Sequence, residues 1–336
     1  MRFKKNLVIT TTPYRVSLFG GGTDLPEAYN LLPEGGAIVS FPIDKYITTV
    51  YVPRLDDKYR IGWSGEPELV DDVNDIQHDL VRGCMEYMKI KDGGIELTFT
   101  GHIPAGSGLS SSACVTVGTL HALYEMLGGR ISQYDLANRA YIIERIAGKN
   151  CGKQDHFGCA MGGLKYIRFL YSGVDVHTIP LSDDDRRKLE ESLYLYHTGI
   201  ERDVSAEDSL QQQGQSAKQN VNHLLALKSI ADRGYEALRT GDIDSVGELL
   251  DENWRHKREL GSVTNPVIDE LYGVAKECGA KGGKICGAGL GGSFITYSSK
   301  SDFDELFIRR AREIGVNLKR IPFKINNEGS KVIHSE

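Results

Sequence analysis

One segment combines glycines and hydroxyls in a way that suits a phosphate group. It is Pro104-Ala105-Gly106-Ser107-Gly108-Leu109-Ser110-Ser111-Ser112-Ala113, which lies between a predicted strand ending at Thr100 and a predicted helix beginning near Ser111. Glycines let the backbone approach a ligand closely, and a helix start offers free N–H groups and the positive end of a dipole. No Walker-loop lysine follows. The segment predicts a nucleotide-phosphate site. A serine-rich N-cap on an ordinary helix is the alternative.

A second glycine-rich segment lies near the end of the chain. It reads Lys284-Ile285-Cys286-Gly287-Ala288-Gly289-Leu290-Gly291-Gly292 and contains the pattern GxGxxG. A dinucleotide-binding turn would be followed by a helix, but residues 293–297 have a strand pattern. We therefore expect a loop that closes over a ligand; a tight turn before the strand is the alternative.

Charged side chains flank a third glycine run, in Pro13-Tyr14-Arg15-Val16-Ser17-Leu18-Phe19-Gly20-Gly21-Gly22-Thr23-Asp24. The run places the Arg15 cation and the Asp24 carboxylate near one loop. Alone this pattern is weak, because an arginine in a strand usually faces solvent and an aspartate in a turn usually bonds its own backbone.

A pair of carboxylates follows the first glycine-rich segment. Glu144 lies on a predicted helix, and Asp155 lies eleven positions further on, in the sequence CGKQDHFG. Two carboxylates near a phosphate site could hold Mg²⁺ and orient or deprotonate an acceptor hydroxyl. His156 could also act as a base, although a packing histidine is the more common role for such a residue.

The elements that would position these residues are a mixture of strands and helices. Strand patterns cover residues 8–19, 37–52, 95–100, 164–170, 193–197, 293–297 and 318–324. Helical patterns cover residues 76–88, 111–127, 132–147, 206–260 (broken near Gly241), 266–278 and 302–314. Residues 148–163 are expected to form a glycine-rich loop. Strands and helices without strict alternation indicate an α+β fold with two lobes.

Composition excludes several classes of protein. Of the 336 residues, 40% are hydrophobic, and 40 basic and 46 acidic side chains give a net charge of −6. The high hydrophobic fraction with a small net charge excludes predominant disorder. The negative sign of the net charge argues against a nucleic-acid binder. No apolar run reaches the ~20 residues of a membrane helix, and no signal-peptide core follows the charged start, so we expect a cytoplasmic protein. The six cysteines have no CxxC spacing and are expected to be reduced and mostly buried.

Taken together, the segments PYRVSLFGGGTD, PAGSGLSSSA and KICGAGLGGS occur in the order typical of GHMP sugar kinases, and the chain resembles that family over residues 13–293. The segments GGGTDLPEAY, GGAIVSFPIDKYI and GKQDHFGCAMGG resemble the heptose 7-phosphate kinases within it. The resemblance implies an N-terminal lobe over residues 1–175 with a mixed sheet and a ferredoxin-like C-terminal lobe over residues 176–336. It also implies ATP and Mg²⁺ as cofactors, transfer to the C1 hydroxyl of D-glycero-D-manno-heptose 7-phosphate, and no nucleic-acid or membrane partner; a homodimer is left open.

The resemblance assigns roles to individual residues. The implied ATP-phosphate residues are Pro104, Gly106, Ser107, Gly108, Leu109, Ser110, Ser111 and Ser112. The implied Mg²⁺ ligands are Ser112 and Glu144, and the implied catalytic residues are Asp155, near the acceptor hydroxyl, and Arg15. The implied substrate residues are Gly22, Thr23, Asp24, Gly287, Gly289, Arg202 and Lys257, of which the two cations would clamp the phosphate of the substrate.

Two departures and three alternatives accompany this interpretation. Galactokinases carry Glu-His before the Thr-Asp pair, where this chain has Gly21-Gly22, and some heptose kinases carry Gln at the position of His156. Arg202 and Lys257 could equally be solvated surface charges. The alternatives are a kinase for fucose or another sugar, a non-catalytic regulator that binds sugar and ATP, and a decarboxylase of the same superfamily.

Overall fold

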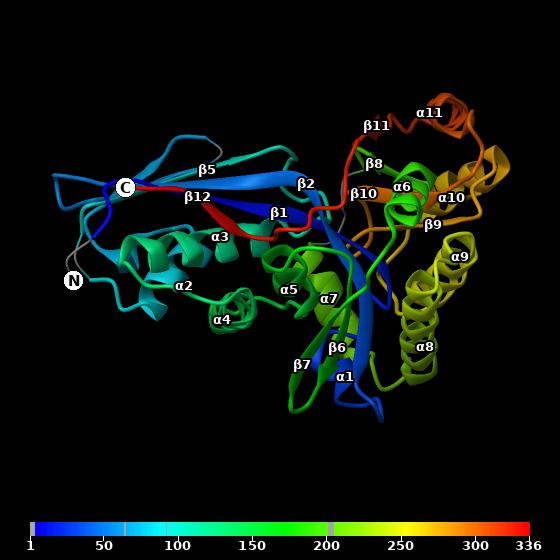
Figure 1. Cartoon of the computed structure of the whole chain (residues 1–336), viewed down its shortest axis with the longest axis horizontal. Helices are drawn as coiled ribbons and strands as arrows, with labels where there is room; N and C mark the ends of the chain where they lie inside the picture. Colours follow the sequence, from blue (N-terminus) through cyan, green and yellow to red (C-terminus); the bar gives the residue numbers. More distant parts are fainter. Residues whose placement is uncertain (1–3, 64, 92, 201–204) are drawn as a thin grey trace.

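The computed structural model describes residues 4–63, 65–91, 93–200 and 205–336, and its strands form two separate sheets (Figure 1). The larger sheet has the order β12-β1-β2-β5-β3-β4, with β6 paired to β2 and β7 paired to β6. Its strands are β1 (Val8–Phe19), β2 (Gly36–Pro53), β3 (Tyr59–Gly62), β4 (Glu68–Val70), β5 (Ile95–Gly101), β6 (Lys165–Leu170), β7 (Gly173–Thr178) and β12 (Lys331–Ser335). All of its pairs are antiparallel except β3 with β5.

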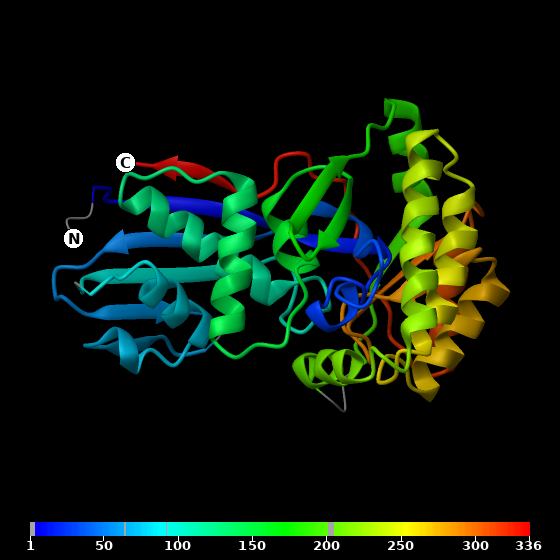
Figure 2. The same ribbon diagram turned by 90° about the horizontal axis from the view of Figure 1, so that it is seen from below.

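The 18-residue strand β2 sets the shape of this sheet. Its first part, residues 36–40, pairs with β6, and its last part, residues 47–53, pairs with β5. Helices cover one face of the sheet, as the two views in Figures 1 and 2 show. They are α2 (Asp79–Tyr87), α3 (Ser111–Met126) and α4 (Gln133–Ile146). Short elements complete the lobe: α1 (Pro26–Tyr29), the 3₁₀ turn η1 (Val73–Asp75) and α5 (Gln154–Ala160).

The smaller sheet is antiparallel, with the order β11-β8-β10-β9. Its strands are β8 (Leu193–His197), β9 (Gly282–Ile285), β10 (Ser293–Tyr297) and β11 (Lys319–Arg320). The helices of this part of the chain are α6 (Asp183–Ser192), α7 (Ala206–Gln215), α8 (Val221–Arg239), α9 (Ser245–Arg258), α10 (Pro266–Cys278) and α11 (Phe303–Glu313). The two sheets with their helices confirm the expectation of an α+β fold with two lobes.

A continuous apolar core links the two sheets. One cluster of buried side chains includes Val39 and Phe41 of the large sheet together with Leu195 and Ile295 of the small one. The chain also returns to its start, because β12 pairs with β1, and the boundary drawn from the sequence at residue 175 falls inside β7. The larger sheet is thus completed by residues from the end of the chain.

Several expected elements differ from the structure. Residues 154–160 form helix α5 rather than loop, and residues 216–220 separate α7 from α8 within the region expected to be continuous helix up to Gly241. The closing strand is β12, whereas within residues 318–324 only Lys319 and Arg320 pair. Pro322 explains the last difference, because proline has no N–H to donate to a sheet. The strands β1, β8 and β10 begin and end where the sequence patterns do.

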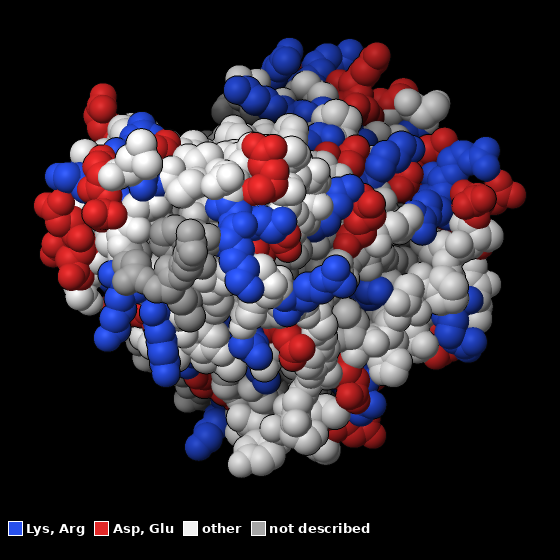
Figure 3. All heavy atoms as spheres, turned by 60° about the vertical axis from the view of Figure 1, so that its left-hand side comes forward, with Lys and Arg blue, Asp and Glu red and all other residues white. Residues whose placement is uncertain are grey.

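The surface and the cysteines agree with the composition. Basic and acidic side chains are interspersed over the face shown in Figure 3. All six cysteines are buried, as expected, and the structure has them as free thiols. Among the described residues, no helix is both long and apolar enough to cross a bilayer.

The packing of α9 on β9 gives a stability test. A Cβ at Gly282 would lie 2.1 Å from the carbonyl oxygen of Gly247, so Gly282→Ala must force backbone apart. We expect a loss of about 1–3 kcal/mol in the free energy of unfolding, measured by urea denaturation. The exposed Gly273 in α10 has no atom within 4 Å of the position that a Cβ would take, so the control Gly273→Ala should gain up to ~1 kcal/mol. Equal effects of the two substitutions would contradict this account.

Candidate active site

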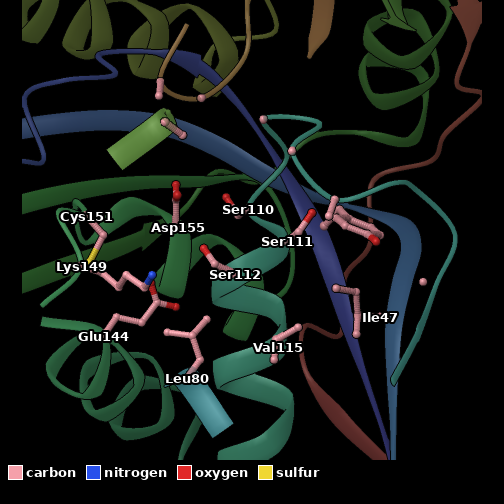
Figure 4. Close-up of a pocket in the computed structure, with 18 of the residues that line it drawn as sticks. Ile47, Leu80, Ser110, Ser111, Ser112, Val115, Glu144, Lys149, Cys151 and Asp155 are labelled. Carbon is pink, nitrogen blue, oxygen red and sulfur yellow. The ribbon is translucent and has the colours of Figure 1, made fainter. Parts of the chain in front are cut away.

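A cavity of about 620 Å³ opens between the lobes, and most of the chemically active residues line it (Figure 4). Its walls include the turn before α3, the side chains of Arg15, Glu144 and Asp155, and the backbone of Gly287 and Ala288. Residues of α7 complete the wall on the side of the second lobe. The cavity therefore brings together residues from all four segments that the sequence singled out.

The turn before α3 is shaped to present backbone and hydroxyl groups. Gly106 and Gly108 both have a φ of +77°, and Ser110 has a φ of +71°, a left-handed conformation that favours glycine at such positions. Leu109 is fully buried, and its carbonyl accepts a hydrogen bond from the N–H of Arg15 at 3.2 Å. The hydroxyls of Ser110 and Ser111 are buried with no hydrogen-bond partner among the described residues. These groups and the N-terminus of the 16-residue helix α3 fit an anion.

Arg15 and Asp155 form an ion pair at one end of this turn. The Nε and Nη2 atoms of Arg15 donate to Oδ1 of Asp155 at 3.0 and 2.5 Å, and Nη1 donates to the carbonyl of Gly108 at 3.0 Å. The Arg15 side chain is 1% exposed and that of Asp155 is 23% exposed. Burial acts to lower the pKa of Arg15, but Asp155 raises it above its usual value. The guanidinium is therefore charged, and Asp155 reaches the cavity.

Two neighbouring side chains orient the Glu144 carboxylate near the turn before α3. Its Oε1 accepts a hydrogen bond from the hydroxyl of Thr116 at 2.7 Å and lies 3.2 Å from Nε2 of His156. Glu144 is 2% exposed and His156 is fully buried. Burial acts to lower the pKa of His156, but the adjacent Glu144 carboxylate raises it. Figure 4 shows Ser112 and Glu144 facing the same hollow, and their hydroxyl and carboxylate oxygens are the donor types that Mg²⁺ prefers. The two residues therefore fit that ion.

The glycine run at residues 20–22 and the acidic residue Asp24 that follows it do not line the cavity. The Asp24 carboxylate accepts hydrogen bonds from the N–H of Gly22 at 3.1 Å and from the side chain of Gln154 at 2.8 Å. Burial, followed by the charge of Asp155, raises the pKa of Asp24. Thr23 is fully buried and bonds the backbone of Gly20 and Ala37, so it holds the loop against β2.

Two buried lysines lie close to Asp24. Lys257, 4% exposed, donates to the side-chain oxygen of Gln213 at 2.7 Å, and Gln213 in turn donates to the carbonyl of Ala288 in the cavity wall. Burial lowers the pKa of Lys257 to about 7 against the opposing effect of Asp24. Lys284 donates to the carbonyl of Ser17 at 2.7 Å, and burial lowers its pKa to about 8. Lys257 is therefore not a solvated surface charge.

The second glycine-rich segment touches the first. A Cβ at Gly287 would lie 2.8 Å from the carbonyl oxygen of Gly108, so the two loops are in backbone contact. Gly287 lines the cavity, whereas Gly289 (φ +102°) packs against the backbone of Val263. The predicted substrate residue Arg202 lies outside the described residues.

The sequence did not reveal two parts of this site. One is Lys284, because a lysine in a strand gives no functional signal by itself. The other is the apolar end of the cavity, where Trp63, His78 and Phe99 gather with Ile47, Leu80 and Val115. The ring centroids of Trp63 and His78 are 4.5 Å apart, and those of His78 and Phe99 are 6.1 Å apart. These residues come from separate strands, turns and helices, so no local motif marks them.

Comparison with known families gives two matches. The family model of the GHMP kinases N-terminal domain matches residues 79–163, and the model of the GHMP kinases C-terminal domain matches residues 235–315. The first match contains the turn before α3, Glu144 and Asp155, and the second contains Lys257, Lys284 and Gly287.

Curated relatives match along most of the chain. A D-glycero-alpha-D-manno-heptose 7-phosphate kinase of Campylobacter jejuni is 28% identical over 306 residues, which cover 86% of this chain and 88% of that protein. A galactokinase of Thermotoga maritima is 24% identical over 344 residues, covering 91% and 95%. Two enzymes with different sugar acceptors are thus similar to this chain at comparable levels.

Solved structures share the fold. A D-glycero-D-manno-heptose 1-phosphate kinase from Bacteroides thetaiotaomicron has a TM-score of 0.78 at 23% identity, covering 97% of this chain and 99% of that one. A galactokinase of Lactococcus lactis in complex with galactose has a TM-score of 0.78 at 20% identity, covering 97% and 95%. At these identities the likeness extends to the fold alone.

Proposed function

The chain belongs to the GHMP kinases, and on this premise we propose that it is an ATP-dependent sugar kinase whose acceptor is D-glycero-D-manno-heptose 7-phosphate, phosphorylated at the C1 hydroxyl. The observation that carries the proposal is the position of Asp155. Its carboxylate is held by two hydrogen bonds from Arg15 at the edge of a cavity whose neighbouring wall is the anion-binding turn before α3. A phosphoryl group and an acceptor hydroxyl could meet there.

The residues of the chain would act mainly through positioning and charge. The N–H groups and hydroxyls before α3 would bind the ATP phosphates, and Arg15 would offset charge on the transferred group. Asp155 would accept a hydrogen bond from the C1 hydroxyl and orient it towards the γ-phosphorus. An anomeric hydroxyl is more acidic than an ordinary alcohol, so little is demanded of a base. Ser112 and Glu144 would hold Mg²⁺, which supplies charge neutralisation at the phosphates when bound.

The apolar end of the cavity fits the base of the nucleotide. A purine can stack on the flat aromatic rings at this end, which belong to Trp63, His78 and Phe99. The apolar wall is extended by Ile47 and Val115. The same cavity continues to the turn before α3, so one ligand with an aromatic base and a phosphate chain would fill both ends.

One feature favours an acceptor that carries its own phosphate, and a second argues against galactose. Lys257 is a buried cation with Asp24 as its nearby opposite charge, and it is connected to the cavity wall at Ala288 through Gln213. A buried amine is costly unless an anion offsets it, and a substrate phosphate would do so. In addition, Gly21 and Gly22 stand where galactokinases have Glu-His. The similarity to galactokinases nevertheless makes a kinase for galactose the second candidate.

Coupled ADP release measured across a panel of acceptors tests the proposal. The panel should contain D-glycero-D-manno-heptose 7-phosphate, its unphosphorylated form, galactose and fucose, with mevalonate diphosphate for the decarboxylase alternative. We expect the highest kcat/KM for heptose 7-phosphate. Turnover of galactose alone would transfer the assignment to the second candidate, and ATP binding without any turnover would favour a regulator.

Asp155→Asn separates catalysis from nucleotide binding. The substitution keeps the shape of the side chain and removes its charge, so kcat should fall by about 10²–10⁴-fold, the usual contribution of a general base. ATP affinity, measured by calorimetry, should change little because the phosphates contact the turn before α3. The variant needs a parallel unfolding curve, since it leaves Arg15 without its ion-pair partner. Unchanged kcat in a folded variant would remove Asp155 from the reaction.

Lys257→Met tests whether the acceptor carries a phosphate. Losing a charged contact to a phosphate costs about 1.5–3 kcal/mol, so kcat/KM for the phosphorylated sugar should fall about 10–100-fold. For the wild type, kcat/KM should also fall as the pH rises through about 7, because Lys257 then loses its proton. Free sugar should lack this pH effect, and the exposed control Lys300→Met should leave both values unchanged. An equal loss for both acceptors would show that Lys257 does not contact the phosphate.

A further inference from the structure

Three side chains with different donor atoms converge beside the candidate Mg²⁺ site. Glu144 comes from α4, Cys151 from the segment that follows it, and His156 from α5. One carboxylate oxygen, the sulfur and one ring nitrogen all lie within 4.8 Å of one another. All three residues are buried, with exposures of 2%, 7% and 0%. The spacing of these residues in the sequence is not that of a known metal motif, so only the fold brings them together.

Neighbouring side chains fix two of the three donors. The hydroxyl of Thr116 donates to Glu144 Oε1 at 2.7 Å, and His156 Nε2 lies 3.2 Å from the same oxygen. The ring of His156 also packs edge-on against Tyr141, with centroids 5.7 Å apart. Such outer contacts orient ligands at metal sites. Glu144 and Cys151 both line the large cavity, which gives an ion a path from solvent.

The donor set differs from the one that Mg²⁺ requires. Mg²⁺ binds oxygen ligands almost exclusively, whereas a thiolate, an imidazole and a carboxylate together suit Zn²⁺ or Co²⁺. Three protein ligands leave one tetrahedral position open towards the cavity for water or a phosphate oxygen. We propose that Glu144, Cys151 and His156 form a binding site for a divalent transition-metal ion such as Zn²⁺.

The site would control the candidate kinase because it shares Glu144 with the Mg²⁺ site. A carboxylate held by Zn²⁺ between Cys151 and His156 is not available to Mg²⁺ at Ser112, so Zn²⁺ inhibits turnover in competition with Mg²⁺. On binding, the thiol of Cys151 releases its proton to solvent as the sulfur–metal bond forms, and a protonated His156 likewise releases the proton of its ligating nitrogen. Metal binding itself is independent of the proposed function, whereas the inhibition rests on it.

Co²⁺ titration of the full chain without nucleotide tests the binding directly. The titration is done in a non-thiol reductant, and absorption is recorded in the near-ultraviolet and visible ranges. We expect one Co²⁺ per chain, a sulfur-to-cobalt charge-transfer band, and loss of that band when Zn²⁺ is added. Cys151→Ser should abolish the band, and His156→Asn should weaken Co²⁺ affinity at least ~10-fold. The matched control is Cys278→Ser in α10, which should keep the band.

The outcomes separate this proposal from the proposed function. A folded wild type without the charge-transfer band, or a band that persists in Cys151→Ser, overturns the metal site. A band that depends on Cys151 supports the site even where the panel of sugars shows no turnover. Where a sugar is turned over, Zn²⁺ should inhibit less as Mg²⁺ increases, and Cys151→Ser should weaken that inhibition at least ~10-fold. Inhibition that Mg²⁺ does not relieve overturns the shared use of Glu144.

Discussion

The buried guanidinium of Arg15 is the constraint around which the site is arranged. Taking a charge out of water costs several kcal/mol, and the cost is recovered only where partners satisfy it. Here Asp155 and the carbonyl of Gly108 are those partners, so strand β1, helix α5 and the turn before α3 have to meet at one point. The same contacts that offset the burial of Arg15 therefore place a carboxylate beside an anion-binding turn.

Close backbone approach is the second constraint, and it explains why glycines mark the site. Helix α5 packs so tightly on Arg15 that a Cβ at Gly158 would lie 3.1 Å from the stem of the arginine. The contact of Gly287 with Gly108 joins the two lobes in the same way. A larger residue at either position would separate Asp155, or the second loop, from the turn that binds phosphate. The glycines thus set distances between elements rather than provide flexibility.

The chemistry-bearing residues could be predicted from the sequence because type and order carry the information. Arg15, Glu144 and Asp155 stand in or near motifs whose order matches one family, and the structure places all three around one cavity. Helix α5 could not be predicted, because its glycine is required by packing against β1, a contact that the local pattern does not contain. The apolar end of the cavity, Lys284 and the thiol of Cys151 were missed for a related reason. Each gains its role only from residues that are distant in the sequence.

The charges behind the cavity explain why the site can be selective. Asp24, Lys257 and Lys284 are buried together, and burial shifts the pKa of each towards its neutral form. Such a cluster costs free energy in the empty protein, because each lysine has only its amide or carbonyl partner in exchange for the water it loses. A ligand that supplies both hydroxyls for Asp24 and a negative charge for Lys257 would satisfy both groups, whereas an uncharged sugar would satisfy only one. With an uncharged sugar, the Lys257 amine, which burial shifts towards its neutral form, would find no anion in the ligand and would stay unsatisfied. Discrimination between acceptors would therefore arise from two sources: the hydrogen bonds that the preferred acceptor forms, and the buried groups of the protein that a poorer acceptor leaves without a partner.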